Sequence, residues 1–346
     1  MRAAVFEGPG NIRIQQVPDP EVELTTDAVV RIVSAAICGS DLWSYRGYGQ
    51  RMPGARIGHE FVGIVDDVGA DVRTVRPGDL VISPFTWSDG TCEYCLDGLH
   101  TSCVDGGVFA EPGHDGAQGE AVRVPHADGT LVVVPPVLRD ADPGLLLPLC
   151  DVLPTGHHAA RVAGVRFGRR VVVVGDGAVG LCAVIAARRL GAESVVVIGH
   201  HEERLELAGR LGATDTVLGR GEEAVEQAMT ITGGAHAVLE CVGAQASLDT
   251  AIAVARDGAT VGYVGVPHLV EGIDLGLLFG RNVGIAGGIA PARAYIPELL
   301  KDIALGDLDA SAVLDATVDL EGVPDGYVAM DTRKSVKVRV DIGSAS

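Results

Sequence analysis

The sequence contains no long hydrophobic run, and this absence argues against a membrane-spanning helix. None of its apolar stretches reaches the ~18 residues that a membrane span requires. The opening stretch, MRAAVFEGPGNIRI, also lacks the apolar segment and the small-residue cleavage site of a secretory signal. Together these absences predict a cytoplasmic protein without a membrane partner.

Positive charge is scarce as well, and this argues against a nucleic-acid partner. The 346 residues include 27 Lys and Arg against 46 Asp and Glu, so the formal net charge is −19. A nucleic-acid interface needs clustered Lys and Arg to neutralise the phosphates. The acidic balance says little else, because such a surface often serves only to keep a protein soluble.

The cysteine count also lacks the pairing of a disulfide framework. Seven cysteines are an odd number in a chain that looks cytoplasmic, where disulfides are rare. This count favours metal ligands and free thiols. The hydrophobic content of 47% and the charged content of 21% are those of an ordinary globular protein. A chain of this length suggests about two domains.

The chain has two parts with different sequence patterns. Up to about residue 150 the sequence shows short apolar runs that are separated by Pro, Gly and Asp turn signals, which is typical of a partly closed β-barrel or sandwich. The strands expected there include residues 28–38, 61–68, 80–83 and 131–134. From residue 171 strands and helices alternate, and this order predicts a doubly wound parallel sheet.

The alternation in the second half places each expected element in order. Strands are expected at 171–174, 194–198, 215–218, 237–241, 259–265 and 283–286. Helices are expected at 181–190, 202–211, 222–231 and 244–256. The tail beyond residue 290 shows a helix at 295–305 and a strand at 336–342, and we expect it to rejoin the first domain.

The stretch VVVVGDGAVG at residues 171–180 carries the clearest chemical signal. Four consecutive valines predict a strand that is buried on both faces. Of the three glycines that follow, the first permits the turn, the second admits a pyrophosphate and the third lets helix and strand pack closely. The helix N-terminus offers N–H groups to the anion. The residues predicted to cradle it are Gly175, Gly177, Ala178, Val179 and Gly180. A tight turn in another α/β fold is the alternative.

Three short motifs place metal-binding residue types beside predicted strands. Cys38 follows one strand, His59 opens the next, and Asp151 follows Leu149 and Cys150. Each of the three also has an ordinary interpretation. Cys38 is then an inert buried thiol, His59 a core histidine and Asp151 a helix cap.

Taken together, the motifs resemble those of the zinc-dependent medium-chain dehydrogenases and reductases over essentially the whole chain. The resemblance rests on Cys38-Gly39-Ser40-Asp41, Gly58-His59-Glu60-Phe61-Val62-Gly63, Arg76-Pro77-Gly78-Asp79-Leu80-Val81, the cysteine loop 89–103, Asp151 and the glycine loop. It implies a Rossmann doubly wound parallel sheet, formed by the cofactor-binding domain 153–288. It also implies a β-rich GroES-like catalytic domain, made of residues 1–152 and 289–346.

The resemblance further implies a catalytic zinc held by Cys38, His59 and Asp151. Three protein ligands and one open position are typical of catalytic zinc, and thiolate, imidazole and carboxylate are all suitable ligands. Glu60 would be an adjacent ligand that can swing onto or off the metal. Because Cys150 adjoins Asp151, a shift of one residue in the alignment would exchange the two. The zinc would act as a Lewis acid on the substrate oxygen.

The same resemblance gives roles to the residues around Cys38. Ser40 would bond the substrate oxygen and pass its proton on. The family often has a histidine three residues later, where this chain has Trp43, which has no acceptor for a proton. The proton is therefore expected to leave through water or through the ribose hydroxyls of the cofactor. Asp41 is expected to orient His59.

The cysteine loop resembles the structural zinc lobe of the family. The family pattern has four cysteines, and this chain has Asp89 in the first place with Cys92, Cys95 and Cys103 in register. Aspartate can ligate zinc through oxygen, so the pattern predicts a structural zinc site with three thiolates and one carboxylate. A loop without metal is the alternative, and His100 is an alternative ligand to Asp89.

The end of the second strand of the cofactor domain bears on the choice of nicotinamide cofactor. An NAD site places an acid there to hold the ribose 2′-OH, and this chain has Gly199. A glycine leaves room for a 2′-phosphate, and NADP-using relatives show a similar arrangement. The residues expected to face that phosphate are His200, His201 and Arg204. NADP(H) is therefore predicted over NAD(H). Alternatively, the two histidines are solvated turn residues and Glu202 is the acid.

Other residues fit the nicotinamide side of the site. The expected contacts are Thr155, Val242, Val264 and Val266, near the carboxyl ends of the strands. Candidates for an apolar substrate pocket are Trp43, Phe85, Trp87, Phe109 and Leu278, each of which is also an ordinary core or surface residue. An apolar pocket favours a hydrophobic alcohol, aldehyde or ketone.

These features predict a zinc-dependent, NADP-preferring alcohol dehydrogenase or carbonyl reductase with a small-molecule substrate. One alternative is a polyol or amino-alcohol (threonine-type) dehydrogenase of the same fold. Another is a non-catalytic nucleotide-binding protein, since a fold does not determine a function. The resemblance also implies a homodimer or homotetramer, because the family associates through the last strand of the cofactor-domain sheet.

Overall fold

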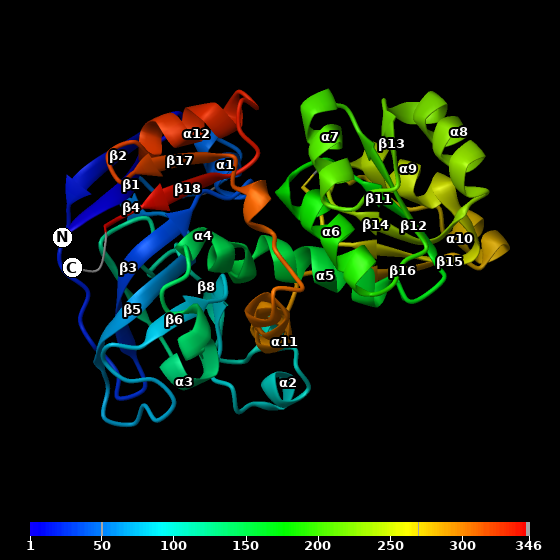
Figure 1. Cartoon of the computed structure of the whole chain (residues 1–346). Coiled ribbons are helices and arrows are strands. Elements are labelled where there is room, and N and C mark those ends of the chain that lie inside the picture. Colours follow the sequence, from blue (N-terminus) through cyan, green and yellow to red (C-terminus); the bar gives the residue numbers. More distant parts are fainter. Residues whose placement is uncertain (50, 269, 344–346) are drawn as a thin grey trace. The chain divides into compact units, whose positions relative to one another are not determined.

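The computed structural model describes residues 1–49, 51–268 and 270–343 (Figure 1). They form two compact units, Met1–Asp151 with Pro291–Ser346 and Val152–Ala290. Among the described residues, no helix has both the length and the apolar character needed to cross a membrane. The assignment of a catalytic role to one unit and a cofactor-binding role to the other stays a prediction.

The first unit is built mainly from antiparallel strands. Its largest sheet has the order β10-β6-β5-β3-β18-β17, with β9 also paired to β3, beside smaller sheets of order β2-β1-β4 and β7-β8. The strands are β1 (Arg2–Gly8), β2 (Asn11–Gln16), β3 (Ala28–Ala36), β4 (Ala55–Arg56), β5 (Glu60–Val68), β6 (Leu80–Ser83), β7 (Thr86–Trp87), β8 (Gly107–Val108), β9 (Ala121–Val124), β10 (Val132–Val133), β17 (Ala316–Asp319) and β18 (Val338–Asp341). The C-terminal strand β18 thus lies beside β3, which it pairs in antiparallel orientation.

The helices of the first unit are mostly short. They are α1 (Asp41–Tyr45), α2 (Glu93–Leu96), η1 (His100–Ser102), α3 (Ala127–Thr130), η2 (Pro136–Leu138), α4 (Pro143–Leu146), η3 (Leu147–Cys150), α11 (Ala292–Leu305), η4 (Ser311–Val313) and α12 (Val323–Asp331). The sequence analysis did not predict α12, although Val323, Tyr327 and Met330 repeat on one helical face and are buried. Pro324 and Gly326 interrupt that pattern. Because proline and glycine have the lowest helix propensities, the sequence does not indicate a helix here.

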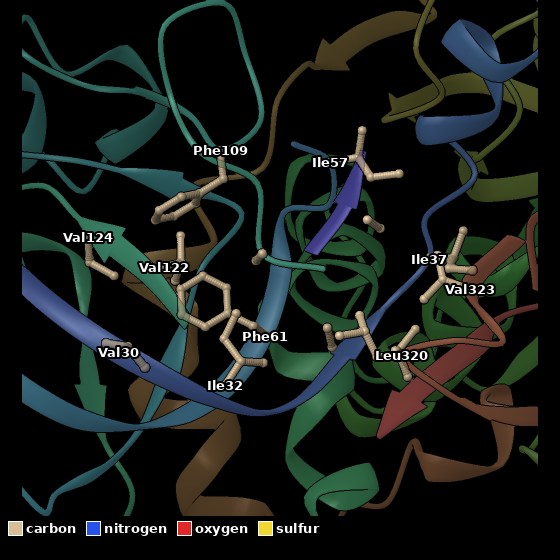
Figure 2. Close-up of a cluster of buried hydrophobic side chains, with 14 of the residues drawn as sticks. Val30, Ile32, Ile37, Ile57, Phe61, Phe109, Val122, Val124, Leu320 and Val323 are labelled. Atoms are coloured by element: carbon tan, nitrogen blue, oxygen red, sulfur yellow. The ribbon is translucent and has the colours of Figure 1, made fainter. Parts of the chain in front are cut away.

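A buried hydrophobic cluster holds the two central strands of the first unit in place (Figure 2). Phe61 of β5 packs edge-to-face on Phe109 at 5.3 Å between ring centroids, and Trp87 packs on Phe109 at 5.4 Å. Leu320 and Val323 from the C-terminal segment belong to the same cluster. Trp87 and Phe109, which are candidates for a substrate pocket, are therefore core residues.

The second unit is a parallel sheet with helical crossovers. The strand order is β13-β12-β11-β14-β15-β16, which is the order of dinucleotide-binding folds. Its elements are α5 (Val152–Val162), β11 (Arg170–Val174), α6 (Ala178–Arg189), β12 (Ser194–Gly199), α7 (Glu202–Arg210), β13 (Asp215–Leu218), α8 (Gly221–Thr232), β14 (Ala235–Glu240), α9 (Gln245–Val254), β15 (Ala255–Tyr263), α10 (Leu275–Arg281) and β16 (Gly284–Gly287). The predicted fold class is confirmed.

The valine run behaves as its sequence predicts. Val171, Val172 and Val173 are completely buried in β11, between β12 and β14. The boundary between the helix expected at 244–256 and the strand after it was predicted wrongly, because residues 255 and 256 begin β15 and do not end the preceding helix. Around that point the pairing of β14 with β15 is irregular, and a local sequence pattern does not show such a shift in register.

Candidate metal centres and cofactor loop

Four potential metal ligands converge in the first unit. One ligand atom each from Cys38, His59, Glu60 and Asp151 lies within 4.8 Å of the others. Ala36, at the end of β3, pairs with Glu60 at the start of β5. Cys38 follows β3 and His59 precedes β5, so both lie at these neighbouring strand ends. The Asp151 Oδ2 atom lies 3.5 Å from both the Cys38 Sγ and the His59 Nε2 atoms.

The structure distinguishes Asp151 from its neighbour Cys150. The Asp151 carboxylate faces the thiol and the imidazole, whereas the Cys150 thiol is fully buried and contacts the Phe61 carbonyl oxygen at 3.2 Å. Burial raises the pKa of Cys150 well above its usual value. The geometry therefore supports the alignment that assigns Asp151, and not Cys150, as the third candidate ligand.

The cluster is short of positive charge for the acids it contains. Burial raises the pKa of Cys38, and the nearby charges of Asp151 and Glu60 raise it further. Burial also raises the pKa of Glu60, and the Glu60 Oε2 atom is buried without a hydrogen-bond partner among the described residues. A bound cation would relieve both effects, because it stabilises a thiolate and supplies a partner for a carboxylate oxygen.

Asp41 lies on the far side of the His59 ring from the cluster. Its Oδ1 atom is 3.5 Å from the His59 Nδ1 atom, and its Oδ2 atom accepts a hydrogen bond from the Cys38 N–H at 3.0 Å. Burial lowers the pKa of His59, but the charge of Asp41 and the hydrogen bonds of His59 outweigh it, so that this pKa lies well above its usual value. Asp41 can thus orient the ring and leave Nε2 toward the other ligands.

Two residues that the sequence analysis missed hold Asp41 in turn. The Gln118 amide donates to the Ala36 carbonyl oxygen at 3.1 Å and to the Asp41 carboxylate at 3.5 Å, and it accepts from the Tyr327 hydroxyl at 3.1 Å. A Cβ atom on Gly58 would lie 2.5 Å from the Gln118 side chain, so the glycine before His59 makes room for this amide. No local sequence pattern marks Gln118 or Tyr327.

Lys337 is a third residue that the sequence analysis missed. Its Nζ atom lies 2.6 Å from the Glu60 Oε1 atom and donates to the Ile37 carbonyl oxygen at 3.4 Å. Both side chains of the ion pair are buried. Burial acts to lower the pKa of Lys337, but the charge of Glu60 outweighs it and the pKa is raised. The Glu60 carboxylate is therefore held by a cation on one oxygen only.

Ser40 and Trp43 lie next to this cluster in the chain. Ser40 is exposed and directly precedes helix α1. The Trp43 ring is half-buried and packs edge-on against the Tyr48 ring at 5.6 Å. Of the other predicted pocket residues, Phe85 has its ring centroid 6.4 Å from that of His59. Leu278 belongs to the second unit, where it packs against a hydrophobic cluster.

The cysteine loop brings its predicted ligands together as well. Ligand atoms of Asp89, Cys92, Cys95 and Cys103 lie within 4.8 Å of one another. The Asp89 carboxylate accepts hydrogen bonds from the Thr91 and Cys92 N–H groups at 2.6 and 2.8 Å. Burial and the neighbouring thiols raise the pKa of Cys95 to about 12. His100, the alternative ligand, is not part of this group.

The glycine loop of the second unit has the shape of an anion cradle. Gly175 follows β11 with a φ of +118°, a conformation that side chains disfavour. A Cβ atom on Gly180 would lie 2.0 Å from the Gly175 carbonyl oxygen, so the close packing of helix and turn requires a glycine there. Ala178 and Val179 begin helix α6 after Gly177, and no atom would crowd a Cβ at Gly177.

The residues predicted for the nicotinamide side follow neighbouring strands. Val242 comes after β14, and Val264 and Val266 come after β15, which pairs with β14. Val242 and Val266 are exposed, whereas Thr155 is buried within α5. A residue that was not predicted, Glu240, organises the turn by accepting hydrogen bonds from the Val242 and Gly243 N–H groups, each at 2.9 Å.

At the end of β12 the structure departs from the reasoning based on sequence. Gly199 was expected to leave open space, but the side chain of Asp176 from the glycine loop fills it. The Asp176 carboxylate, His200 and His201 bring potential ligand atoms within 4.8 Å of one another. Arg204 lies one turn farther along, in α7. A contact between two loops, which no local pattern reveals, thus changes the surroundings of Gly199.

Comparisons with known proteins agree with this geometry. The family described as alcohol dehydrogenase GroES-like domain matches residues 25–136, and the family described as zinc-binding dehydrogenase matches residues 178–304. A zinc-type alcohol dehydrogenase B of Aspergillus flavus is 33% identical over 351 residues, covering 98% of this chain and 80% of the relative. The chain belongs to the zinc-dependent medium-chain dehydrogenase/reductase family.

Further relatives match this medium-chain dehydrogenase over most of its length. A medium-chain reductase/dehydrogenase of Acremonium sp. is 41% identical over 278 residues, covering 78% of this chain and 94% of the relative. The solved structure of an alcohol dehydrogenase from Thermus sp. ATN1 has a TM-score of 0.93 and 34% identity, and covers 99% of this chain and 100% of that chain. The protein is therefore an oxidoreductase, of a family that uses zinc and NAD(P) and acts on small-molecule alcohols.

Proposed function

We propose that this dehydrogenase transfers a hydride between a nicotinamide dinucleotide and an alcohol, with its aldehyde or ketone as the other reactant. The observation that carries the proposal is the convergence of the buried Cys38 and His59 with the half-buried Asp151 in a chain that also has a dinucleotide-type glycine loop. Thiolate, imidazole and carboxylate are a donor set that suits zinc, and the unpartnered oxygen of Glu60 fits a cation nearby. A zinc ion bound there would supply Lewis-acid polarisation of the substrate oxygen.

The residues around the metal site have separate roles in this proposal. Asp41 holds the His59 ring so that Nε2 faces Asp151, and Lys337 neutralises Glu60. Ser40 donates or accepts the hydrogen bond to the substrate oxygen. Trp43 offers only an N–H donor and would not take a proton from Ser40, so water or the ribose hydroxyls of a bound cofactor would have to accept it. Glu60, which brings a ligand atom within 4.8 Å of those of Cys38, His59 and Asp151, would serve as an alternate ligand.

The preference between NADP(H) and NAD(H) is a further part of the proposal. The prediction of NADP(H) over NAD(H) rests on the missing side chain at Gly199 and on His200, His201 and Arg204. Steady-state kinetics with both cofactors tests it. Asp176, which that prediction did not consider, favours the opposite preference.

A substrate panel tests the proposed reaction. Phe85, beside His59, and Trp43, close to Ser40 in sequence, are the aromatic residues left to line the substrate side, and they favour apolar alcohols and ketones. We expect higher kcat/KM for simple secondary alcohols and aldehydes than for sorbitol or threonine. Higher activity on sorbitol or threonine would identify a polyol or amino-alcohol dehydrogenase. Binding of NADH without turnover of any substrate would identify a non-catalytic nucleotide-binding protein.

We further propose that the loop 89–103 holds a structural zinc through Asp89, Cys92, Cys95 and Cys103. The purified protein is then expected to contain about two zinc ions per chain, and Cys95→Ser about one, as mass spectrometry of the metal content can measure. The variant should also unfold at a lower temperature, because a structural zinc stabilises the loop that it closes. Cys182→Ser, at a buried thiol outside both clusters, is the matched control and should keep both ions.

Two more variants of the loop separate its candidate ligands. Asp89→Ala should lose the second zinc, and His100→Ala should keep it, because His100 is not among the residues that converge. A wild-type protein with about one zinc per chain would show that the loop holds no metal. If His100→Ala lost the second zinc ion and Asp89→Ala kept it, His100 and not Asp89 would be the ligand.

The proposal includes a homodimer or homotetramer. Among the described strands, β16 lies at the edge of the second unit's sheet and pairs with β15 alone. An unpaired strand edge can pair with a second copy. Light scattering of the purified protein measures its assembly, and a monomer would contradict this part of the proposal.

A further inference from the structure

An acid in the glycine loop reaches the end of the neighbouring strand. Asp176 follows β11, and β11 pairs in parallel with β12, which ends at Gly199. The Asp176 Oδ2 atom accepts hydrogen bonds from the backbone N–H groups of His200 and His201 at 2.8 and 2.9 Å. It also lies 3.0 Å from the His201 Nδ1 atom. The carboxylate therefore caps the turn that follows β12.

The environment of Asp176 keeps its carboxyl group ionised. The residue is only 4% exposed, and burial alone would raise its pKa. The hydrogen bonds from His200 and His201 and the charge of His201 outweigh this effect, and the pKa lies below its usual value. A negative charge thus sits at the carboxyl end of β12 at neutral pH.

Gly199 and Asp176 depend on each other. A Cβ atom at residue 199 would lie 2.6 Å from the Asp176 Oδ2 atom and 2.7 Å from its Cβ atom. Any side chain at position 199 would therefore displace the carboxylate of Asp176. The glycine at the end of β12 is thus explained by the aspartate that lies over it, and a 2′-phosphate is not needed to explain it.

The carboxyl end of the second strand is where a doubly wound domain binds the adenosine ribose. NAD-dependent proteins place a carboxylate there that accepts a hydrogen bond from the ribose 2′-OH. A 2′-phosphate at the same place would meet a like charge at close range, which opposes its binding. Glu202 in the first turn of α7 adds further negative charge beside it. In addition, the backbone N–H groups of His200 and His201, which follow Gly199, already donate to Asp176.

We infer that Asp176 supplies, from the glycine loop, the carboxylate that Gly199 cannot, and that it makes the site select NAD(H) over NADP(H). This inference rests on the proposed dinucleotide-dependent function. It assigns Asp176 as the residue that determines cofactor specificity, and it gives Gly199 the supporting role of leaving space for it.

Steady-state kinetics of the zinc-loaded enzyme tests the inference through the ratio of kcat/KM for NAD⁺ to kcat/KM for NADP⁺. The wild type should favour NAD⁺, and Asp176→Asn should shift the ratio toward NADP⁺ by about tenfold or more, because it removes the like charge. Asparagine keeps an oxygen that can accept from the two N–H groups. Glu203→Gln removes one charge from the adjoining turn without touching Gly199 and should leave the ratio within about twofold.

Three results would overturn the inference. The first is a wild-type enzyme that favours NADP⁺. The second is an Asp176→Asn variant with an unchanged ratio. The third is a Glu202→Gln variant that shifts the ratio as much as Asp176→Asn does, since Glu202 would then be the acid that contacts the ribose.

Binding of cofactor fragments separates this inference from the proposed function, because it requires neither zinc nor turnover. Calorimetric titration of the wild type with adenosine 5′-monophosphate and with adenosine 2′,5′-bisphosphate should show weaker binding of the bisphosphate. Tighter binding of the bisphosphate would overturn the selectivity and leave the dinucleotide function standing. If neither fragment nor NADH binds, the proposed function fails, and the inference fails with it.

Discussion

Replacing Cys38 with serine is expected to lower turnover by about 1,000-fold or more, since Lewis-acid polarisation supplies several kcal/mol of transition-state stabilisation. The expected cause is loss of the metal, because Cys38 is the one thiol that faces His59 and Asp151 in the described cluster. The zinc content should fall from about two ions per chain to about one. Metal analysis and steady-state kinetics on the same preparation measure both effects.

Cys150→Ser is the matched control for this substitution. Both thiols are buried, but that of Cys150 contacts the Phe61 carbonyl oxygen and does not face the cluster. The control should keep both zinc ions and most of the turnover. If Cys38→Ser retained its metal and its activity while Cys150→Ser lost them, the cysteine ligand would have been assigned to the wrong residue.

Replacing Lys337 with methionine is expected to lower the free energy of unfolding by about 3–5 kcal/mol, which is typical of breaking a buried ion pair from one side. Lys337 is 1% exposed and Glu60 is completely buried, so the substitution leaves the Glu60 carboxylate without its cation. Methionine fills a similar volume and keeps the packing of the side-chain stem. Denaturant unfolding of wild type and variant at neutral pH measures the difference.

Two further variants serve as controls for the effect of Lys337→Met. Lys334→Met removes an exposed lysine from the same segment and should change the free energy of unfolding by no more than about 0.5 kcal/mol. The double variant Glu60→Gln with Lys337→Met should recover part of the lost stability, because it removes the carboxylate that was left unpaired. A loss below about 1 kcal/mol in Lys337→Met would show that the ion pair contributes little.

Much of the fold could be predicted because its signals are local. The run Val171 to Val174 has no polar alternation, which only a strand covered on both faces tolerates, and it forms the centre of the parallel sheet. Gly175 and Gly180 are required by backbone geometry within a few residues of each other. By contrast, α12 carries a proline and a glycine that mask its apolar face. The start of β15 depends on a register shift against β14.

The candidate site likewise contains residues that local motifs indicate and residues that only long-range contacts bring in. Cys38, His59 and Asp151 stand in short motifs beside strand ends, and the sequence could therefore indicate them, while their binding of zinc stays a prediction. Lys337 is 277 residues from Glu60 in the chain, and nothing in its own neighbourhood marks it as the partner of a buried acid. Asp176 lies inside a motif that was recognised, yet its contact with the end of β12 exists only once the two strands are paired. Long-range side-chain contacts are what the local patterns could not supply.

Anomalous diffraction at the zinc absorption edge, from crystals of the zinc-loaded protein, tests the central claim most directly. We expect a peak within bonding distance of the Cys38 Sγ, His59 Nε2 and Asp151 carboxylate atoms, at about 2.0–2.3 Å. An active, zinc-containing protein with no peak at these three residues would contradict the account.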